Sequence, residues 1–474
     1  MATLKPDICV IGAGSGGLTI AAAATAFGVP VVLIERGKMG GDCLNYGCVP
    51  SKSMIAAGKQ AHRLAHGAAF GIADREPQVD FDKVMRHVHQ VIAAIAPNDS
   101  AERFTALGVT VIRGEARFLD ARTVAAGSYE IKARRFVIAT GSSPFVPPIP
   151  GLEDVPYLTN ETVFQQRERP EHLIVIGGGP VGLELAQAHR RLGSRVTVLE
   201  AEAALGREDP ELTEIALKHL RAEGVEIIEH AKIARVEKRD QVGMRIHFEN
   251  GQGTHAIEGS HLLVATGRKP NTESLMLERA SIEHNSRGLK VSANLRTTNR
   301  RVYAIGDVAG GPQFTHAANY HAGLVIRAVL FRLPVREDRT LIPRVTFTDP
   351  ELAHIGLTEP EAKRRDADTK VLRWPFAEND RAQTEHQTEG FIKLVASRRG
   401  RILGVSIVGH GAGEMMNFWS LALSKKLTAR DIAGYIAPYP TFGEVGKRAA
   451  FAYFAGAARS GLVRGLIRFL RLFG

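Results

Sequence analysis

A glycine-rich turn between two apolar runs, with an acidic residue ending the second run, occurs twice in this chain. The repeated residues are Gly12, Gly14, Gly17 and Glu35 in the first copy, and Gly177, Gly179, Gly182 and Glu200 in the second. In such a strand–turn–helix–strand pattern the glycines let the backbone approach a pyrophosphate, whose charge the helix N-terminus attracts. The acidic residue receives ribose hydroxyls. The repeat therefore predicts an α/β fold with two Rossmann-like dinucleotide-binding domains.

A further element accompanies each copy of the pattern. An apolar run ending in Ala-Thr-Gly follows the first copy at 136–141 and the second copy at 262–267. A single glycine pattern would be weak evidence, because glycine-rich turns are common. Four matched elements that recur in the same order are specific. We therefore expect two bound dinucleotides, with Thr140, Gly141 and Gly267 among the cofactor-binding residues.

Two of the three cysteines, Cys43 and Cys48, lie close together in a glycine-rich stretch. A disulfide across so short a loop would remove little chain entropy, so the pair fits a redox couple better than a structural brace. Zinc sites usually need four ligands with different spacing. Pro50 and Ser51 indicate that a helix starts beside Cys48, and a helix N-terminus favours the reactive thiolate. Lys52 lies one helical turn after Cys48, on the same face.

These motifs together resemble a known enzyme family. The sequence Gly-Gly-Asp-Cys43-x4-Cys48-Val-Pro-Ser-Lys52, both glycine patterns, and Ala-Ile-Gly-Asp307 are similar to the pyridine nucleotide–disulfide oxidoreductases, which include lipoamide dehydrogenase, glutathione reductase and mercuric reductase. The resemblance extends over nearly the whole chain. It implies FAD on the first glycine pattern, a nicotinamide cofactor on the second, and contact of Asp307 with the ribityl and pyrophosphate part of FAD.

The resemblance also implies a domain layout. We expect a discontinuous FAD-binding domain at 1–149 and 270–340, and an NAD(P)-binding domain at 150–269. The segment 342–352 resembles the start of the family's dimerisation domain, so 341–474 is expected to be an α+β interface domain. A homodimer follows from this assignment.

The resemblance assigns roles to the residues near the flavin. Cys48 would form the thiolate in contact with the flavin, and Cys43 would exchange with the acceptor. Lys52 would pair with Glu184, so that a cation held by an anion stabilises the charge of the reduced flavin. The alternative is that Lys52 and Glu184 are solvated helix charges. Glu200 favours NADH over NADPH, because a carboxylate there repels a 2′-phosphate.

The C-terminal motif departs from the family pattern. Thiol-reducing members carry His-Pro-Thr-x-x-x-Glu, and here Tyr439 occupies the histidine position while Glu444 keeps the place of the carboxylate. A tyrosine with a pKa near ~10 is a poor proton shuttle at neutral pH. Efficient reduction of lipoamide or glutathione disulfide is therefore not expected. Tyr439 is either a hydrogen-bond donor to a quinone or another oxygen acceptor, or a packing residue of the interface.

Composition excludes several classes of protein. The net charge of +11 is scattered except at the C-terminus, so nucleic-acid binding is not expected. No histidine group has the spacing of a metal site, and we expect no bound metal. His316 and His321 are expected to be packing or surface residues rather than a replacement base. Few cysteines and an N-terminus that enters a strand at once favour the cytoplasm.

The C-terminal segment 461–474 combines a cationic face with an apolar one. Arg464, Arg468 and Arg471 lie on one side of a helix, and leucine, isoleucine and phenylalanine lie on the other. This pattern is typical of a helix that lies on an anionic bilayer, here the inner face of the membrane. The alternative is a helix that docks on the protein's own dimer.

The sequence thus predicts an FAD-dependent NAD(P)H oxidoreductase that passes electrons through the flavin and Cys43–Cys48. The small-molecule electron acceptor is left open among a disulfide, a metal ion such as Hg²⁺, and a quinone. The alternative function is a diaphorase at the membrane surface, or a component of a complex, with low intrinsic disulfide reductase activity.

Overall fold

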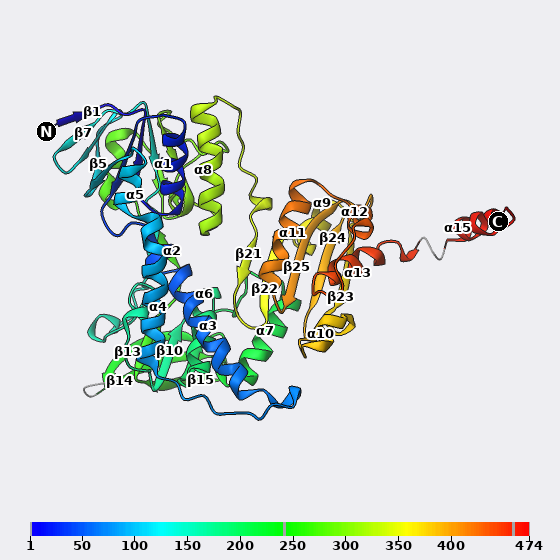
Figure 1. Cartoon of the computed structure of the whole chain (residues 1–474). Helices are drawn as coiled ribbons and strands as arrows, with labels where there is room; N and C mark the ends of the chain where they lie inside the picture. The colour runs from blue at the N-terminus through cyan, green and yellow to red at the C-terminus, as the bar shows by residue number, and fades with distance from the viewer. Residues whose placement is uncertain (1, 240–242, 457–459, 474) are drawn as a thin grey trace. The chain divides into compact units, whose positions relative to one another are not determined.

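The computed structural model describes residues 2–239, 243–456 and 460–473 (Figure 1). They divide into two compact units, Met1–Ala203 with Gly224–Arg339, and Ala204–Glu223 with Thr340–Gly474. Both expected dinucleotide-binding domains lie in the first unit, whereas 204–223, expected in the NAD(P) domain, groups with the second. The positions 1, 240–242, 457–459 and 474, which belong to the predicted domains and tail, lie outside the described residues. The three-domain layout stays a prediction.

A five-stranded parallel sheet carries the first glycine turn. Its order is β20-β8-β2-β3-β4, with β2 (Ile8–Ile11), β3 (Val31–Glu35), β4 (Thr110–Arg113), β8 (Arg135–Ile138) and β20 (Val302–Ala304). Successive residues of β2 serve opposite faces, as strand geometry requires. Ile8 and Val10 belong to the core that contains the helices α1 (Ser15–Ala26) and α8 (Thr315–Leu330), which lie side by side (Figure 1).

The other face of this sheet is covered by a second sheet. Cys9 and Ile11 belong to a separate core with Phe118 and Val124. The covering sheet has the order β1-β7-β6-β5 and consists of β1 (Ala2–Leu4), β5 (Ala116–Asp120), β6 (Thr123–Ala126) and β7 (Tyr129–Ile131). Cys9 is fully buried, and this burial raises the pKa of its thiol. It is a core residue, as its position in the first strand predicted.

The second glycine turn is built on a similar parallel sheet. Its order is β12-β11-β10-β16, with β10 (His172–Ile176), β11 (Arg195–Leu199), β12 (Val225–Ile228), β16 (His261–Val264) and the helix α6 (Pro180–Arg191). Ile174 and Ile176 pack into a core with the antiparallel sheet β13-β14-β15. The strands of that sheet are β13 (Lys232–Arg239), β14 (Gly243–Asn250) and β15 (Gly253–Gly259).

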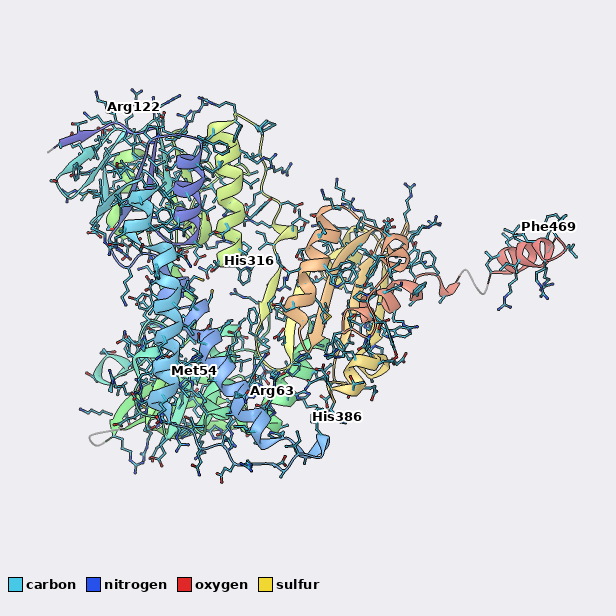
Figure 2. The ribbon with its side chains drawn as sticks, viewed as in Figure 1. Met54, Arg63, Arg122, His316, His386 and Phe469 are labelled. Carbon is cyan, nitrogen blue, oxygen red and sulfur yellow. The ribbon has the colours of Figure 1, made fainter. Side chains whose placement is uncertain are left out.

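Helix α3 (Cys48–Ala65) connects the two dinucleotide-binding parts of the first unit. It packs against α6 and against α4 (Phe81–Ile95). A side chain at Gly58 would come within 3.4 Å of the backbone of Ala188, so this glycine lets α3 approach α6 closely. Met54 of α3 is fully buried (Figure 2). The remaining elements of the unit are α2 (Gly41–Asn45), α5 (Ala101–Ala106), β9 (Ser142–Pro144), β17 (Arg268–Pro270), β18 (His284–Asn285) and β19 (Gly288–Leu289).

The second unit is built around an antiparallel sheet. Its order is β21-β22-β25-β24-β23, with β21 (Arg344–Thr346), β22 (Glu351–Gly356), β23 (Lys370–Pro375), β24 (Phe391–Ala396) and β25 (Ile402–Gly409). The core contains apolar residues of this sheet and of α11 (Ala412–Ser424), α12 (Ala429–Gly434) and α13 (Glu444–Ala452). The described part of the unit also contains the helices α7 (Pro210–Ala222), α9 (Glu359–Arg365) and α10 (Asp380–Thr384).

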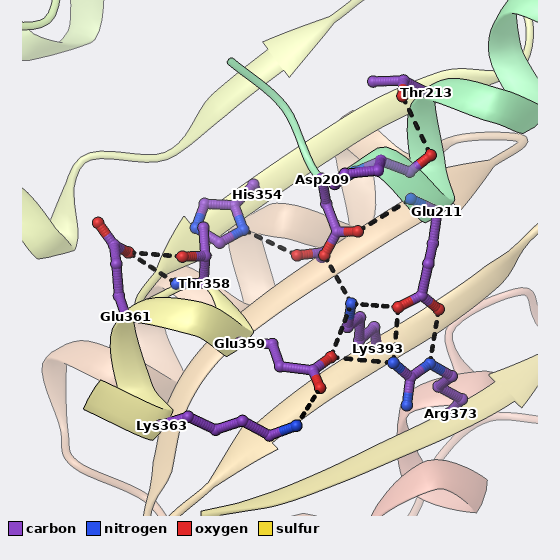
Figure 3. Close-up of polar contacts among 12 residues, drawn as sticks. Asp209, Glu211, Thr213, His354, Thr358, Glu359, Glu361, Lys363, Arg373 and Lys393 are labelled. Carbon is purple, nitrogen blue, oxygen red and sulfur yellow. Dashed lines mark hydrogen bonds and ion pairs between the residues drawn. The ribbon is translucent and has the colours of Figure 1, made fainter. Parts of the chain in front are cut away.

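A charge cluster joins α7 and α9 to this sheet (Figure 3). The ammonium of Lys393 on β24, 3% exposed, contacts Asp209 Oδ2 at 2.7 Å, Glu211 Oε1 at 2.6 Å and Glu359 Oε2 at 2.9 Å. Arg373 on β23 contacts the same two glutamates. The buried cation therefore has charged partners on two helices, which burial of a charge requires.

The last described element is α15 (Gly461–Leu470), the expected C-terminal helix. None of its residues is buried. Among the described residues, every helix is too short or too polar to cross a bilayer.

Candidate active site

The first glycine turn has the geometry of a dinucleotide cradle. Gly12 has φ +108°, and a Cβ there would collide with the carbonyl oxygen of Ala139, while a Cβ at Gly17 would collide with that of Gly12. Gly14 differs, because its Cβ would meet only Gly41 at 4.0 Å. Glu35 accepts a hydrogen bond from Ala13 N at 2.6 Å. A phosphate beside Gly14 would face the N-terminus of α1, which favours anions.

The second glycine turn repeats this construction. Gly177 has φ +112°, and a Cβ there would meet the carbonyl oxygen of Ala265, while a Cβ at Gly182 would collide with Gly177. Gly179 has open space beside it. Glu200 Oε2 accepts from Gly178 N at 2.6 Å, as Glu35 does from the corresponding amide. The residues of both turns thus fit a dinucleotide.

The Ala-Thr-Gly turn of the first copy lies beside a loop from far along the chain. Thr140 Oγ1 donates to the carbonyl of Asn271 at 2.7 Å, and Asn271 N donates to the carbonyl of Gly141 at 3.0 Å. Gly141 has φ +66° and Gly267, in the corresponding turn of the second copy, has φ +139°. Both turns therefore need glycine for their backbone conformation.

Asp307 lies next to this loop. Ser142 Oγ donates to Asp307 Oδ2 at 2.6 Å, and Arg268 Nε is 3.9 Å from the same oxygen. Burial raises the pKa of Asp307, while the hydrogen bond from Ser142 lowers it. Asp307 follows Gly306, whose amide donates to His321 Nδ1 at 3.1 Å.

His321 fixes the turn that carries Asp307. Its ring is 2% exposed, and Nε2 is 3.0 Å from Glu337 Oε1. His316, at the start of α8 (Figure 2), stacks on Phe314 with the ring centres 5.1 Å apart. The structure therefore gives these two histidines packing and positioning contacts.

The two cysteines lie at adjacent helix starts, Cys43 in α2 and Cys48 at the first position of α3. Cys48 Sγ is 3.4 Å from Thr315 Oγ1 on α8. The hydrogen bond from Cys43 lowers the pKa of Cys48 to about 6, assisted by Thr315 and by the charge of Lys52. The same hydrogen bond and burial raise the pKa of Cys43. These opposite shifts of the two pKa values favour Cys48 over Cys43 as the thiolate of the reduced pair.

Lys52 and Glu184 form an ion pair across two helices. Lys52 Nζ on α3 donates to Glu184 Oε2 on α6 at 2.5 Å, and Glu184 is buried. The two residues are far apart in sequence but are brought together by the close α3–α6 contact at Gly58. Lys52 lies one turn from Cys48, so its charge acts on the thiolate.

Tyr439 in the second unit bonds to a residue that the sequence motif did not indicate. Its hydroxyl donates to Asp380 Oδ2 at 2.8 Å, and this bond raises the pKa of Tyr439. The side chain is 69% exposed. Glu444 lies at the first position of α13 and also raises the pKa of Tyr439 through its charge. Tyr439 therefore stays protonated at neutral pH and acts as a donor.

Sequence reasoning missed several residues that hold this site. Thr315 contacts Cys48, while Ser142 and Arg268 contact Asp307. Asp42, between Gly41 and Cys43, accepts from Asn160 Nδ2 at 3.1 Å. All four stand next to a residue that the sequence had singled out: Thr315 beside His316, Ser142 beside Gly141, Arg268 beside Gly267 and Asp42 beside Cys43.

Comparison with known proteins establishes the family to which this chain belongs. The family model described as pyridine nucleotide-disulphide oxidoreductase matches residues 6–322, and the model of the dimerisation domain of that family matches residues 342–450. The chain belongs to the pyridine nucleotide-disulphide oxidoreductases. The resemblance and the α/β fold with FAD- and NAD-type Rossmann-like domains are confirmed, as is the C-terminal dimerisation domain with its antiparallel sheet.

Individual relatives of this oxidoreductase have different names. A mercuric reductase of Lysinibacillus sphaericus is 36% identical over 450 residues, which cover 94% of this chain and 82% of the relative. A dihydrolipoyl dehydrogenase of Geobacillus stearothermophilus is 35% identical over 457 residues, which cover 94% of this chain and 96% of the relative. The solved Cu(II) complex of the HOCl-induced flavoprotein disulfide reductase RclA from Escherichia coli aligns with TM-score 0.84 and 28% identity, covering 95% of this chain and 99% of that one.

The family assignment makes this protein a flavoprotein disulfide oxidoreductase that uses NAD(P)H. FAD and a pyridine nucleotide are typical of the family, and both glycine turns fit them. The dimerisation domain points to a homodimer. Among the described residues, histidine, cysteine and carboxylate side chains form no group of three or more that could hold a metal ion.

Proposed function

We propose that this oxidoreductase transfers electrons from NADH through the Cys43–Cys48 pair to a thiophilic metal ion such as Hg²⁺ or Cu²⁺. The observation that carries the proposal is the pairing of a low-pKa Cys48 with Cys43, combined with Tyr439 at the histidine position. Reduction of a disulfide needs a group that protonates the leaving thiolate, whereas a metal ion needs only thiolate donors and electrons.

The residues around the thiols have defined roles in this proposal. Bound FAD would accept a hydride from NADH and pass an electron pair to the Cys43–Cys48 disulfide. Lys52, held by the buried Glu184, supplies a positive charge beside the Cys48 thiolate. Asp307 and the two glycine turns hold and orient the dinucleotides. Oxidation of the Cys48 thiolate and the Cys43 thiol back to a disulfide releases one proton and two electrons, which reduce one Hg²⁺ to Hg⁰ or two Cu²⁺ to Cu⁺.

NADH is the preferred donor in this proposal because of Glu200. Its carboxylate accepts from Gly178 N and Glu202 N at the end of β11, where the ribose of a dinucleotide would bind. A carboxylate at this position hydrogen-bonds a 2′-hydroxyl and repels a 2′-phosphate.

The choice of a metal ion agrees with the names of two relatives. One relative is a mercuric reductase, and one similar solved structure is a Cu(II) complex of a flavoprotein disulfide reductase. This chain has no cysteine after Cys48, so the proposed metal ion meets its thiolates only at Cys43–Cys48.

The deciding experiment is anaerobic reduction of the FAD-loaded enzyme with NADH, followed by stopped-flow reoxidation. Hg²⁺, Cu²⁺, lipoamide, glutathione disulfide and a quinone are each mixed in turn. We expect fast reoxidation by the metal ions, its loss in Cys43→Ser, and its retention in the control Cys9→Ala, because Cys9 is buried in the core. Fast reoxidation by a disulfide alone would contradict the metal-ion acceptor.

A second candidate, a diaphorase at a membrane surface, is favoured by α15. Leu462, Leu466 and Ile467 are 88%, 57% and 52% exposed, and Phe469 is also exposed (Figure 2). Arg464 and Arg468 occupy the other side of the helix, and the sequence after Glu444 contains no acidic residue. An exposed apolar face beside arginines fits an anionic lipid surface, which would hold a cytoplasmic enzyme at the inner face of the membrane.

Liposome co-sedimentation tests this second candidate. The full chain is compared with a chain lacking 461–474, using vesicles with anionic lipids and vesicles of neutral lipids. We expect binding of the full chain to anionic vesicles only, and its loss on deletion. Unchanged binding after deletion excludes the tail as the membrane contact, and a loss of dimer on deletion would instead identify it as a dimer contact.

A further inference from the structure

A cavity of about 380 Å³ lies in the first unit, away from both glycine turns. Its lining includes Arg135, the first residue of β8, and Tyr303 of β20. These residues lie toward the N-terminal ends of parallel strands, whereas the Gly12 turn follows the C-terminal end of β2 in the same sheet. The cavity therefore lies at the opposite end of the strands from the Gly12 turn, where FAD is expected to bind.

Hydrogen-bond donors dominate the polar lining of the cavity. It consists of Arg135, Arg296 and Arg332 together with Asn294 and Tyr303, whose side chains all carry hydrogen-bond donors. Arg296 Nη2 donates to Tyr303 Oη at 3.0 Å, which leaves the hydroxyl proton of Tyr303 for another acceptor. Asn294 Oδ1 accepts from Ser292 Oγ at 2.6 Å and from Arg296 N at 3.3 Å. The cavity has no carboxylate in its lining.

The three arginines lack the acidic partners that such residues usually have. Within the part of the chain that the structure describes, no carboxylate lies within ion-pair distance of Arg135, Arg296 or Arg332. Burial lowers the pKa of Arg135, and the charges of Arg332 and Arg296 lower it further. Arg296 Nε is buried and has no hydrogen-bond partner among the described residues.

An arginine after a helix C-terminus is stabilised by the helix dipole, and this accounts for Arg332, which follows α8. It does not account for Arg135 and Arg296, which come from a strand and from the loop before β20. Their convergence on one cavity, together with Asn294 and Tyr303, is the geometry of a site for oxyanions, because guanidinium groups bind carboxylate and phosphate oxygens in pairs.

We propose that this cavity binds a small anion carrying several carboxylate or phosphate oxygens, separate from the FAD and NADH sites. The volume suits a small molecule rather than a polymer. Arg135, Arg296 and Arg332 supply the charge, and Asn294 and Tyr303 supply neutral donors. This binding site is independent of the identity of the electron acceptor.

Calorimetric titration of the FAD-loaded enzyme tests the site. Saturating NAD⁺ is present so that its own pyrophosphate site is filled, and citrate and inorganic pyrophosphate are the probes. We expect one anion bound per subunit, with binding about tenfold to a hundredfold weaker in Arg135→Gln and in Arg332→Gln. Arg122→Gln is the matched control, because Arg122 is exposed in a turn of the same unit (Figure 2).

A second variant distinguishes loss of anion binding from loss of folding. Asn294→Asp keeps the size of the side chain and adds a carboxylate to the lining, so it should abolish binding while the flavin content stays normal. Binding of either probe that is lost in these variants supports the site, and the tighter probe identifies the anion class. Absence of binding at millimolar concentrations of both probes, or equal binding by all variants, would overturn the proposal.

Discussion

Cys48 differs from the other two cysteines in the groups that surround its sulfur. Cys9 is buried among apolar side chains, which raises the pKa of its thiol, whereas Cys48 has a thiol, a hydroxyl and an ammonium nearby. Thiolate chemistry near neutral pH is therefore confined to one end of α3. The position of Cys48 at a helix start, which the sequence indicated, contributes in the same direction.

Cys43→Ala tests the origin of this low pKa. The hydrogen bond from Cys43 is the largest cause of the lowering, so its removal should shift the pKa of Cys48 from about 6 toward its unperturbed value of ~8.5. The pH dependence of the rate of alkylation of the reduced protein by iodoacetamide measures this shift. Cys43→Ser, which keeps a donor, should shift it less. An unchanged midpoint in Cys43→Ala would show that Lys52 and Thr315 suffice.

Tyr439→His tests whether the missing histidine limits the reduction of a disulfide acceptor. The histidine restores a group that titrates near neutral pH, in place of the tyrosine that now donates to Asp380. We expect lipoamide-dependent oxidation of NADH to rise about 10²-fold, in line with the usual contribution of a general acid–base. Tyr439→Phe is the control and should give no gain. Equal rates in Tyr439→His and wild type would show that the missing histidine is not the limitation.

Some site residues were predictable from the sequence, and others were not. Gly12, Glu35 and Cys48 lie in local motifs whose spacing carries the information. Asp380 and Thr315 come from helices that have no motif, and their contacts depend on how distant segments pack. A local sequence motif therefore identifies the residues of a turn. It does not identify the residues of distant segments that contact them in the folded protein.

At the scale of elements, the cluster around Lys393 connects α7 and α9 to the antiparallel sheet (Figure 3). No sequence motif indicates this cluster, because its members are scattered from Asp209 to Lys393. Its ion pairs hold the start of α7, which lies in the segment 204–223, against the sheet of the second unit.

Lys393→Met tests this connection. The change leaves Asp209 and Glu359 without their buried cation, and we expect a loss of about 3 kcal/mol in the free energy of unfolding. Urea denaturation of the FAD-loaded protein measures the loss. Lys425→Met, at an exposed position after α11, is the control and should have little effect. A loss of similar size in both variants would contradict the role of the cluster.

The same cluster predicts the response of the second unit to acid. Hydrogen bonds from Arg373 lower the pKa of Glu211 to about 2, and contacts with Lys363 and Lys393 lower that of Glu359 to about 2 against the effect of its burial. Carboxylates with a lowered folded-state pKa stabilise the fold above their unfolded value of ~4.3, and this stability is lost as the pH falls toward 2. Thermal unfolding followed from pH 6 to pH 3 should show the decline. In Lys393→Met the decline should be smaller.

At the scale of the whole molecule, the dimerisation domain exposes apolar side chains. Phe418 and Leu421 on α11 are exposed, while Trp419 and Ala422 on the same helix are buried in the core. Exposed apolar residues on a domain of this type mark a surface for a second copy. The homodimer is therefore expected to form through this domain.

Leu421→Lys tests the homodimer. Sedimentation equilibrium should give the wild type a mass about twice the 51.4 kDa of the chain. A charge at the interface should weaken the dimer, because it would be buried without a partner. Leu107→Lys, which alters an exposed apolar residue of the first unit, is the control. A wild-type monomer would contradict the expectation.

The equivalence of the two glycine turns has a consequence for cofactor selection. Gly12 and Gly177 are required for the same steric reason, and Glu35 and Glu200 accept from corresponding amides. Two turns with the same construction cannot by themselves distinguish FAD from a nicotinamide dinucleotide. Discrimination must therefore reside in residues outside the turns, such as Asp307, which contacts Ser142 from a distant part of the chain. The repeated turns supply affinity for any dinucleotide, and segments outside them determine which one binds.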